Sequence, residues 1–167
     1  DVMEEILNLY SDTIPVFVDP VSCAYAETIV DFIGKFHTAK PNILETEILS
    51  GMKIKSKKDL YKAAEKILDK GLKRIFISLG ADGCLYMDRE GKHIERKLAP
   101  VEHMVNASGA GDAFMAAVIY SYINAFTLDK TIDYGLAAGI VAISHEKTIN
   151  PNMSVSLIEN ILKERKI

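Results

Sequence analysis

Two glycines and an aspartate, placed between the end of an expected strand and a long apolar helix, are the residues best suited to chemistry. Residues 106–112 read Asn-Ala-Ser-Gly-Ala-Gly-Asp. Gly109, Ala110 and Gly111 would let backbone amides approach a ligand, and the positive end of the helix dipole attracts phosphate. This arrangement predicts an anion site. A second interpretation stays open, in which Ser108 or Asp112 caps the helix and the glycines allow close packing.

Asp112 is the candidate general base. A carboxylate in the first turn of a helix keeps its charge, so it is a weak base toward an alcohol. Phosphoryl transfer tolerates such a base, because its transition state is loose and the nucleophile needs orientation more than full deprotonation. The sequence lacks the residues that other kinds of enzyme chemistry require. Position 114, where a dinucleotide fingerprint needs glycine, is Phe114, no Walker A sequence is present, and the four histidines are not grouped with a nucleophile.

A second group of polar residues lies at 40–47, in the sequence Lys-Pro-Asn-Ile-Leu-Glu-Thr-Glu. Asn42 and Glu45, with Glu47 nearby, would stand at a strand end and in the first turn of a helix, where their oxygens could position hydrated Mg²⁺ and phosphate. Asn at an N-cap with Glu three residues later is also a capping box, which needs no ligand. Taken alone, the spacing favours the cap.

A third candidate loop is 77–83, where an apolar strand runs into two glycines. Ser78 and the amides of Gly80 and Gly83 could face nucleotide phosphates, since open α/β sheets bind ligands at the carboxyl ends of their strands. A tight turn with glycines at positive φ explains the same residues without a ligand.

The composition limits the partners of the chain. Its 167 residues include 20 Lys and Arg against 23 Asp and Glu, so no excess of positive charge is available for a nucleic-acid backbone. The longest apolar runs, 113–120 and 136–143, are far shorter than the roughly 20 residues that cross a bilayer. Cys23 and Cys84 lie far apart and outside any CxxC sequence, which suits a reducing cytoplasm and argues against structural zinc.

The elements that must position these loops alternate along the chain. Continuous apolar strands with helical crossovers predict a three-layer α/β fold, with a mostly parallel sheet, helices on both faces and an edge hairpin. One domain is the default for this length. We expect helices over 2–10, 24–34, 42–51, 56–71, 110–125, 129–145 and 154–164, strands over 15–20, 36–40 and 74–79, a hairpin of 84–88 and 92–96, and a brief strand at 103–105.

Four motifs in this order resemble the C-terminal half of ribokinase-like (PfkB-family) carbohydrate kinases. They are VDP at 18–20, KPNILETE at 40–47, SLGADG at 78–83 and NASGAGDAF at 106–114, and together they span nearly the whole chain. Within that family, residues 37–47, the DPVS sequence at 19–22 and Asn106 are most similar to pseudouridine kinases.

The resemblance implies transfer of the γ-phosphoryl group of ATP to a primary hydroxyl of a sugar or nucleoside, such as pseudouridine or another ribosyl substrate. Asp112 would be the base in this reaction. The amides of Gly109, Ala110 and Gly111 would form the anion hole for the transferring group.

The resemblance also assigns the cofactor residues. Asn42 and Glu45 would organise Mg²⁺ and phosphate, with Glu45 acting through water. The nucleotide would be held at the loop with Ser78, Gly80 and Gly83. Its base would lie against the start of the helix near Leu136 and the loop containing Asn150.

Two departures from the family pattern change what we expect. Asn106-Ala107-Ser108 replaces the Asp-Thr-Thr of many relatives, which weakens the expectation of a monovalent cation. The N-terminal half with the sugar site and the β lid is absent, and an enzyme of this family runs to roughly 300 residues. We therefore expect the isolated chain to be inactive, and a homodimer could form through the strand edge left exposed. The alternative function is a noncatalytic nucleotide-binding or assembly module.

Overall fold

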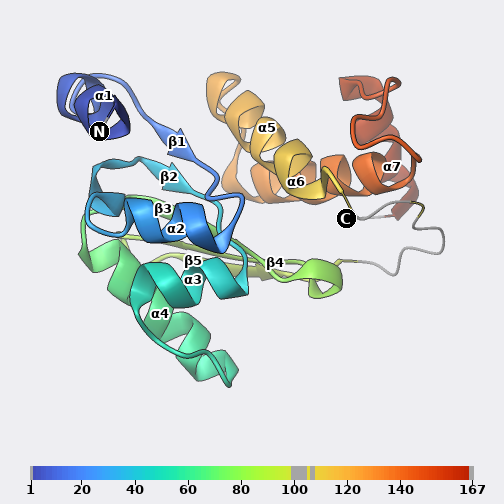
Figure 1. The fold of residues 1–167 in the computed structure, drawn as a ribbon. Coiled ribbons are helices and arrows are strands. Elements are labelled where there is room, and N and C mark those ends of the chain that lie inside the picture. Colours follow the sequence, from blue (N-terminus) through green and yellow to red (C-terminus); the bar gives the residue numbers. More distant parts are fainter. Residues whose placement is uncertain (1, 99–104, 106–107, 166–167) are drawn as a thin grey trace. The chain divides into compact units, whose positions relative to one another are not determined.

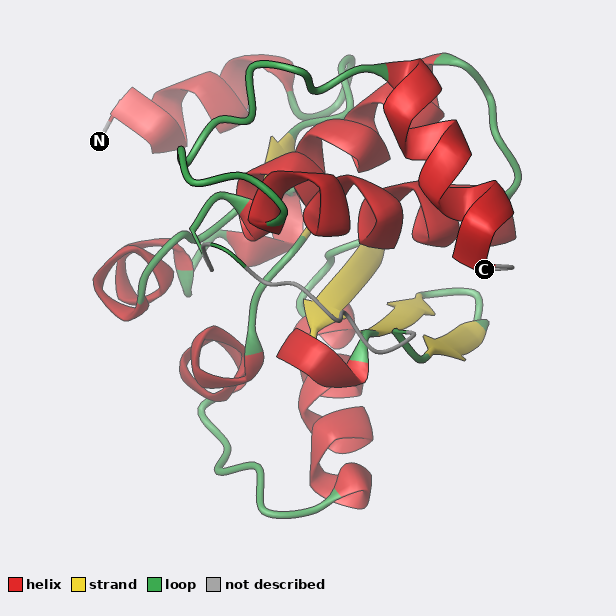
Figure 2. Cartoon of the chain, turned by 90° about the vertical axis from the view of Figure 1, so that its right-hand side faces the viewer, coloured by secondary structure: helices red, strands yellow, loops and turns green. Residues whose placement is uncertain are grey.

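Helices and short strands alternate up to Arg96, and the rest of the described chain is helical (Figure 1, Figure 2). The computed structural model describes residues 2–98, 105 and 108–165. The chain divides into two compact units, one formed by Asp1–Gly80 and Leu85–Glu95 and the other by Ala81–Cys84 and Arg96–Ile167. Each unit has an apolar core of its own.

A five-stranded sheet forms the centre of the first unit. Its spatial order follows the sequence: β1 (Phe17–Val18), β2 (Thr38–Ala39), β3 (Arg74–Ser78), β4 (Cys84–Asp88) and β5 (His93–Arg96). The first three strands are parallel, with Phe17 opposite Thr38 and Thr38 opposite Arg74. The connections from β3 to β4 and from β4 to β5 are too short for parallel crossovers, so these strands are antiparallel. The α/β class, the parallel strands and the edge hairpin are as predicted, in a mixed sheet.

Four helices belong to this unit: α1 (Val2–Tyr10), α2 (Cys23–Ile29), α3 (Ile43–Ser50) and α4 (Lys57–Asp69). Three of them begin at predictable caps, because Ser22, Asn42 and Ser56 each accept a hydrogen bond from the backbone N–H three residues later. Helix α3 ends at Gly51, which has the left-handed conformation common at helix C-termini.

Helix α2 is shorter than the predicted range 24–34. It ends at Ile29, and Ile33–Lys35 forms a separate 3₁₀ turn, η1. Gly34 in this turn lies against the end of α4, where a Cβ atom on Gly34 would be 1.9 Å from the carbonyl oxygen of Lys70. Helical periodicity does not reveal this contact, because it joins segments far apart in the sequence.

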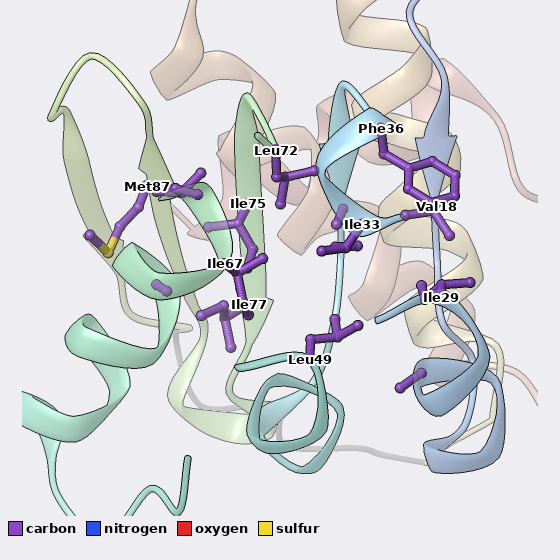
Figure 3. Close-up of a cluster of buried hydrophobic side chains, with 14 of the residues drawn as sticks. Val18, Ile29, Ile33, Phe36, Leu49, Ile67, Leu72, Ile75, Ile77 and Met87 are labelled. Carbon is purple, nitrogen blue, oxygen red and sulfur yellow. The ribbon is translucent and has the colours of Figure 1, made fainter. Parts of the chain in front are cut away.

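The core of the first unit lies between the sheet and the helices α2, α3 and α4, which pack side by side (Figure 3). Leu49 of α3 and Ile67 of α4 are fully buried there. In β3, Ile75 and Ile77 are fully buried, and Phe76 between them packs on another aromatic ring, that of Tyr86. Burial on both faces explains why this strand is continuously apolar.

The described helices of the second unit are α5 (Ala110–Ile123), α6 (Leu128–Ile143) and α7 (Val155–Arg165). Tyr134 of α6 joins them: its ring packs against Tyr120 and Phe126, and its hydroxyl donates to Glu159 Oε1 at 2.7 Å. Burial, followed by the bond to Glu159, raises the pKa of Tyr134 to about 12. The three helices therefore form one packed layer.

The predicted strand at 103–105 lies outside the described residues except for Val105, whose N–H donates to the carbonyl oxygen of Ile143 at 2.9 Å. Among the helices that the structure describes, none combines the length and the apolar character needed to cross a membrane.

Candidate functional site

The carboxyl ends of β1, β2 and β3 share one edge of the sheet, because the three strands are parallel. Asn42 follows β2 and Ser78 ends β3, and these two residues form a parallel β-bridge. The N–H of Ser78 donates to the carbonyl oxygen of Pro41 at 3.0 Å. Two residues predicted from separate motifs are thus neighbours at the edge where open α/β sheets bind ligands.

Asn42 and Glu45 form a capping box at the start of α3. Oδ1 of Asn42 accepts from the N–H of Glu45 at 2.9 Å, and Oε2 of Glu45 accepts from the N–H of Asn42 at 2.9 Å. Glu45 is 2% exposed, so this bond satisfies a buried carboxylate. The capping interpretation is confirmed. Oε1 of Glu45 takes no part in the box.

Asn42 and Glu45 place an amide oxygen and a carboxylate at this edge of the sheet. Carboxylate and amide oxygens are ligands that Mg²⁺ prefers, and Mg²⁺ keeps several of its waters. Within residues 2–98, 105 and 108–165, no three His, Cys, Asp or Glu side chains gather into a metal-binding group. A role for Asn42 and Glu45 in holding hydrated Mg²⁺ stays a prediction.

Glu47 holds the loop that follows α3. One carboxylate oxygen accepts from the N–H of Ile54 at 2.7 Å, and the other accepts from Nζ of Lys53 at 2.9 Å. The bond from Ile54 and then that from Lys53 lower the pKa of Glu47. The carboxylate of Glu47 is thus bonded to the connection between α3 and α4.

An ion pair at the carboxyl ends of β1 and β2 was not predicted. Nζ of Lys40 lies 3.0 Å from Oδ2 of Asp19, and the two side chains are 5% and 15% exposed. Breaking such a buried pair is costly, because the remaining charge would be uncompensated. The pair therefore ties the carboxyl end of β1 to that of β2. A signal was present in the sequence, since each charged residue directly follows an expected strand.

The turn after Asp19 is strained. Val21 has a φ of 61°, which is costly for a β-branched residue, and its side chain is exposed. The N–H of Val21 donates to Oδ1 of Asp19 at 3.2 Å, and the N–H of Ser22 donates to the carbonyl oxygen of Pro20 at 2.6 Å. Strain of this kind is concentrated at functional sites, which makes this turn part of the candidate site.

The two glycines after β3 differ in their surroundings. Gly80 begins the short turn η2 (Gly80–Asp82), and a Cβ atom placed on it would meet nothing within 4 Å. A Cβ atom on Gly83 would lie 2.0 Å from the carbonyl oxygen of Arg96. Gly83 is thus needed for packing, whereas Gly80 has room beside it for a ligand.

In the second unit, α5 begins at a glycine. Gly109 is its N-cap residue and has a φ of 84°, a conformation that favours glycine. A Cβ atom there would also lie 2.2 Å from the carbonyl oxygen of Thr148, which confirms the close-packing role. Helices α2, α3, α4 and α6 have capping side chains at this position, and α5 has none. The amides of its first turn therefore remain candidates for binding an anion.

Ala110, Gly111 and Asp112 form the first turn of α5. Asp112 is exposed, and it lies in the first turn of the helix, at the positive end of the helix dipole. The structure thus brings the predicted base and the predicted anion-binding amides together. Asn106, on which the expectation for a monovalent cation depends, lies outside the described residues.

Asn150 and Leu136 lie in the interior of the second unit. Nδ2 of Asn150 donates to the carbonyl oxygen of Val141, and Oδ1 accepts from the N–H of Asn152, both at 2.9 Å. Leu136 is buried within α6 rather than at its start. A role for either residue in binding a nucleotide stays a prediction.

Comparisons with known proteins agree with the motifs. The model of the pfkB family carbohydrate kinases matches residues 2–154. Pseudouridine kinase of Escherichia coli is 34% identical over 168 residues, which cover 96% of this chain and 53% of that protein. The chain spans about half the length of the curated relatives it matches.

The comparison with solved structures agrees with the sequence comparison. A crystal structure from Clostridium perfringens, described as that of a sugar kinase, has a TM-score of 0.90 and 36% identity, covering 99% of this chain and 51% of that one. Ribokinase of Arabidopsis thaliana, solved with ribose and ATP, has a TM-score of 0.82 at 20% identity, covering 97% of this chain and 52% of that one. The second likeness shows the fold alone.

Proposed function

Because the chain belongs to the pfkB family of carbohydrate kinases, we propose that it forms the C-terminal, nucleotide-binding and catalytic part of a ribokinase-like kinase domain. The reaction is transfer of the ATP γ-phosphoryl group to a primary hydroxyl of a sugar or nucleoside. Pseudouridine, or another ribosyl compound, is the acceptor we expect from the likeness to the E. coli pseudouridine kinase. The cytoplasm is the compartment we expect.

The observation that carries the proposal is the start of α5. The helix begins in the sequence Gly-Ala-Gly-Asp with a left-handed glycine and no capping side chain at the N-cap. Amides of Gly109, Ala110 and Gly111 are the donors that we assign to the transferring phosphoryl group. Preorganised donors of this kind stabilise the charge that develops in the transition state.

Asp112 is the base in this proposal. Its carboxylate, in the first turn of α5, orients the acceptor hydroxyl and accepts the proton late. A loose transition state makes this sufficient for phosphoryl transfer, because bond formation to the hydroxyl oxygen lags behind departure of the leaving group.

Asn42 and Glu45 are the residues that would hold hydrated Mg²⁺, and Ser78, Gly80, Gly83 and Asn150 those that would support the nucleotide. Bound Mg²⁺ would neutralise charge on the phosphates of ATP. The carboxylate of Glu45 is buried at this sheet edge, and the ammonium of Lys40 is paired with Asp19.

Activity of the 167-residue chain alone is not expected, because relatives are about twice as long. We propose that the residues selecting the acceptor lie in the half that this chain does not span. The same observation favours a second candidate function, a noncatalytic nucleotide-binding or assembly module with the inherited fold.

Calorimetric titration of the chain with Mg·ATP tests the nucleotide site. Gly111→Ala is the informative variant, because it adds a methyl group among the proposed donors, and Ala has a higher helix propensity than Gly within α5. Gly109→Ala would instead clash with Thr148 and disturb the fold. We expect wild type to bind and Gly111→Ala to bind at least tenfold more weakly without melting at a lower temperature. Equal affinities would contradict the assignment of the donors.

A further inference from the structure

Helix α6 contains two buried glycines one turn apart, Gly135 and Gly139. Glycine weakens a helix relative to alanine, because it loses more backbone freedom on folding. A glycine inside a helix therefore usually has a packing or functional role. Helix α5 packs against α6 in the second unit (Figure 1), and this contact explains the first of the two glycines.

The ring of Phe114 in α5 occupies the space that a side chain at position 135 would need. A Cβ atom on Gly135 would lie 2.8, 2.9 and 2.9 Å from three atoms at the far end of this ring. The nearest atom to a Cβ atom on Gly139 would be the carbonyl oxygen of Ala110, at an ordinary contact distance of 3.6 Å. Phe114 therefore requires glycine at position 135, whereas position 139 has room for a methyl group. We call the contact between the Phe114 ring and Gly135 the Phe114 notch.

The Phe114 notch lies close to the residues that we assign to phosphoryl transfer. Phe114 follows Asp112 by two residues, which is about 200° of rotation around a helix, so the two side chains point to opposite sides of α5. Phe114 is 5% exposed, whereas Asp112 is exposed. Insertion of the ring against α6 thus fixes the rotation of α5 about its axis, and with it the direction of Asp112.

We propose that Phe114 and Gly135 are positioning residues for phosphoryl transfer, because the Phe114 notch holds the first turn of α5, with Asp112 and the anion-binding amides, in place. This inference rests on the proposed function and adds to it two residues that act through Asp112 and these amides.

The size of the contact indicates how much a change would matter. A methyl group on Gly135 would have to push the ring away by about 0.7 Å to reach an ordinary carbon–carbon distance of about 3.5 Å. A close-packed interior leaves the buried ring little room to turn aside, so the displacement passes to α5. Catalytic groups must be held within about 0.5 Å of their productive geometry, so this displacement is large enough to slow the reaction.

Steady-state kinetics test the proposal in a fusion in which this chain replaces the matching part of the E. coli pseudouridine kinase. Gly135→Ala adds the methyl group that would meet the ring, and Phe114→Leu removes the ring atoms that it would meet. Gly139→Ala is the matched control, because it adds the same methyl group one turn along the same helix without a close contact. All variants are assayed well below their melting temperatures, so that each is folded.

We expect kcat to fall at least tenfold in Gly135→Ala, with KM for pseudouridine nearly unchanged, and Gly139→Ala to stay close to wild type. Phe114→Leu alone should also lower kcat, because the notch is then only partly filled. Phe114→Leu/Gly135→Ala should recover much of the loss, because the methyl group fills the space that the ring leaves. In an Asp112→Asn background, Gly135→Ala should lower the residual rate by a smaller factor, because the base whose position it disturbs is gone.

Four results would overturn the inference: an unchanged kcat in Gly135→Ala, an equal loss in Gly139→Ala, no recovery in the double variant, or the same factor of loss with Asp112 and with Asn at that position. Asp112→Asn as fast as wild type would refute the base in the proposed function, and this inference with it. A slow Asp112→Asn together with a wild-type rate in Gly135→Ala would refute this inference alone.

Discussion

Replacing Glu45 by Gln should leave the fold intact and weaken Mg·ATP binding. The capping box requires only an oxygen that accepts the N–H of Asn42, and the Gln carbonyl oxygen provides one. A site for Mg²⁺ also requires the negative charge, which Gln lacks. Glu45→Gln therefore separates two roles that the same carboxylate has in our account.

The magnitudes follow from the two bonds of the box, each 2.9 Å long. Asn42→Ala removes one N-cap bond, which costs about 1 kcal/mol, and this lowers the melting temperature of a chain of this size by about 2–4 °C. Glu45→Ala leaves the N–H of Asn42 without this acceptor and costs about 1–3 kcal/mol. Glu45→Gln should stay within about 0.5 kcal/mol of wild type while Mg·ATP binding weakens at least tenfold, or about 1.4 kcal/mol.

Thermal melts and calorimetric titrations of the same protein samples give both quantities. Titration with ATP in the presence of EDTA is the control, because the difference between wild type and Glu45→Gln should disappear without the metal. Unchanged Mg·ATP affinity in Glu45→Gln would show that Glu45 is a helix cap alone. A fall in melting temperature as large as that of Asn42→Ala would show that the box itself needs the charge.

Three further predictions concern stability. Burial, with two basic neighbours, lowers the pKa of His37 below its ordinary 6.5, so on acidification the unfolded chain takes up a proton before the folded chain does, and the free energy of unfolding falls as the pH drops through about 6.5. Between pH 8 and 5 the melting temperature should therefore fall more for wild type than for His37→Gln, and parallel curves would exclude this cause. Val21→Asn should raise the melting temperature by about 2–4 °C, because Asn tolerates the left-handed backbone that is costly for Val; an unchanged temperature would mean that the turn is not strained. Gly34→Ala should lower the free energy of unfolding by about 2–3 kcal/mol, since its Cβ atom would overlap the Lys70 carbonyl, whereas Gly80→Ala, in open space, should lower it by about 1 kcal/mol. Denaturant unfolding measures both values, and equal values would contradict the close packing of Gly34.

Local chemistry made much of this fold predictable. Ser22, Asn42 and Ser56 each precede an apolar helical pattern, and each is the observed N-cap. The apolar run of β3 correctly indicated a buried strand. These features depend on residues close in sequence, so a single sequence contains them.

Contacts between distant segments were not predictable in the same way. The early end of α2 at Ile29 accompanies the approach of Gly34 to Lys70, and the ion pair of Asp19 with Lys40 forms only because β1 and β2 are adjacent. For the candidate site, the sequence located Asn42, Glu45 and the start of α5, but it could not show that Glu47 holds the α3–α4 loop.

The central claim, that this chain carries a phosphoryl-transfer site with Asp112 as base, is tested most directly by a transfer assay in a fusion in which this chain replaces the matching part of the E. coli pseudouridine kinase. Radiolabelled γ-phosphate of ATP is followed into pseudouridine for wild type and for Asp112→Asn, and calorimetry confirms that both bind Mg·ATP. We predict pseudouridine phosphorylated at its primary hydroxyl with wild type, and a rate at least a hundredfold lower with Asp112→Asn. A fusion that binds both substrates yet transfers nothing, or an Asp112→Asn variant as fast as wild type, would contradict the account.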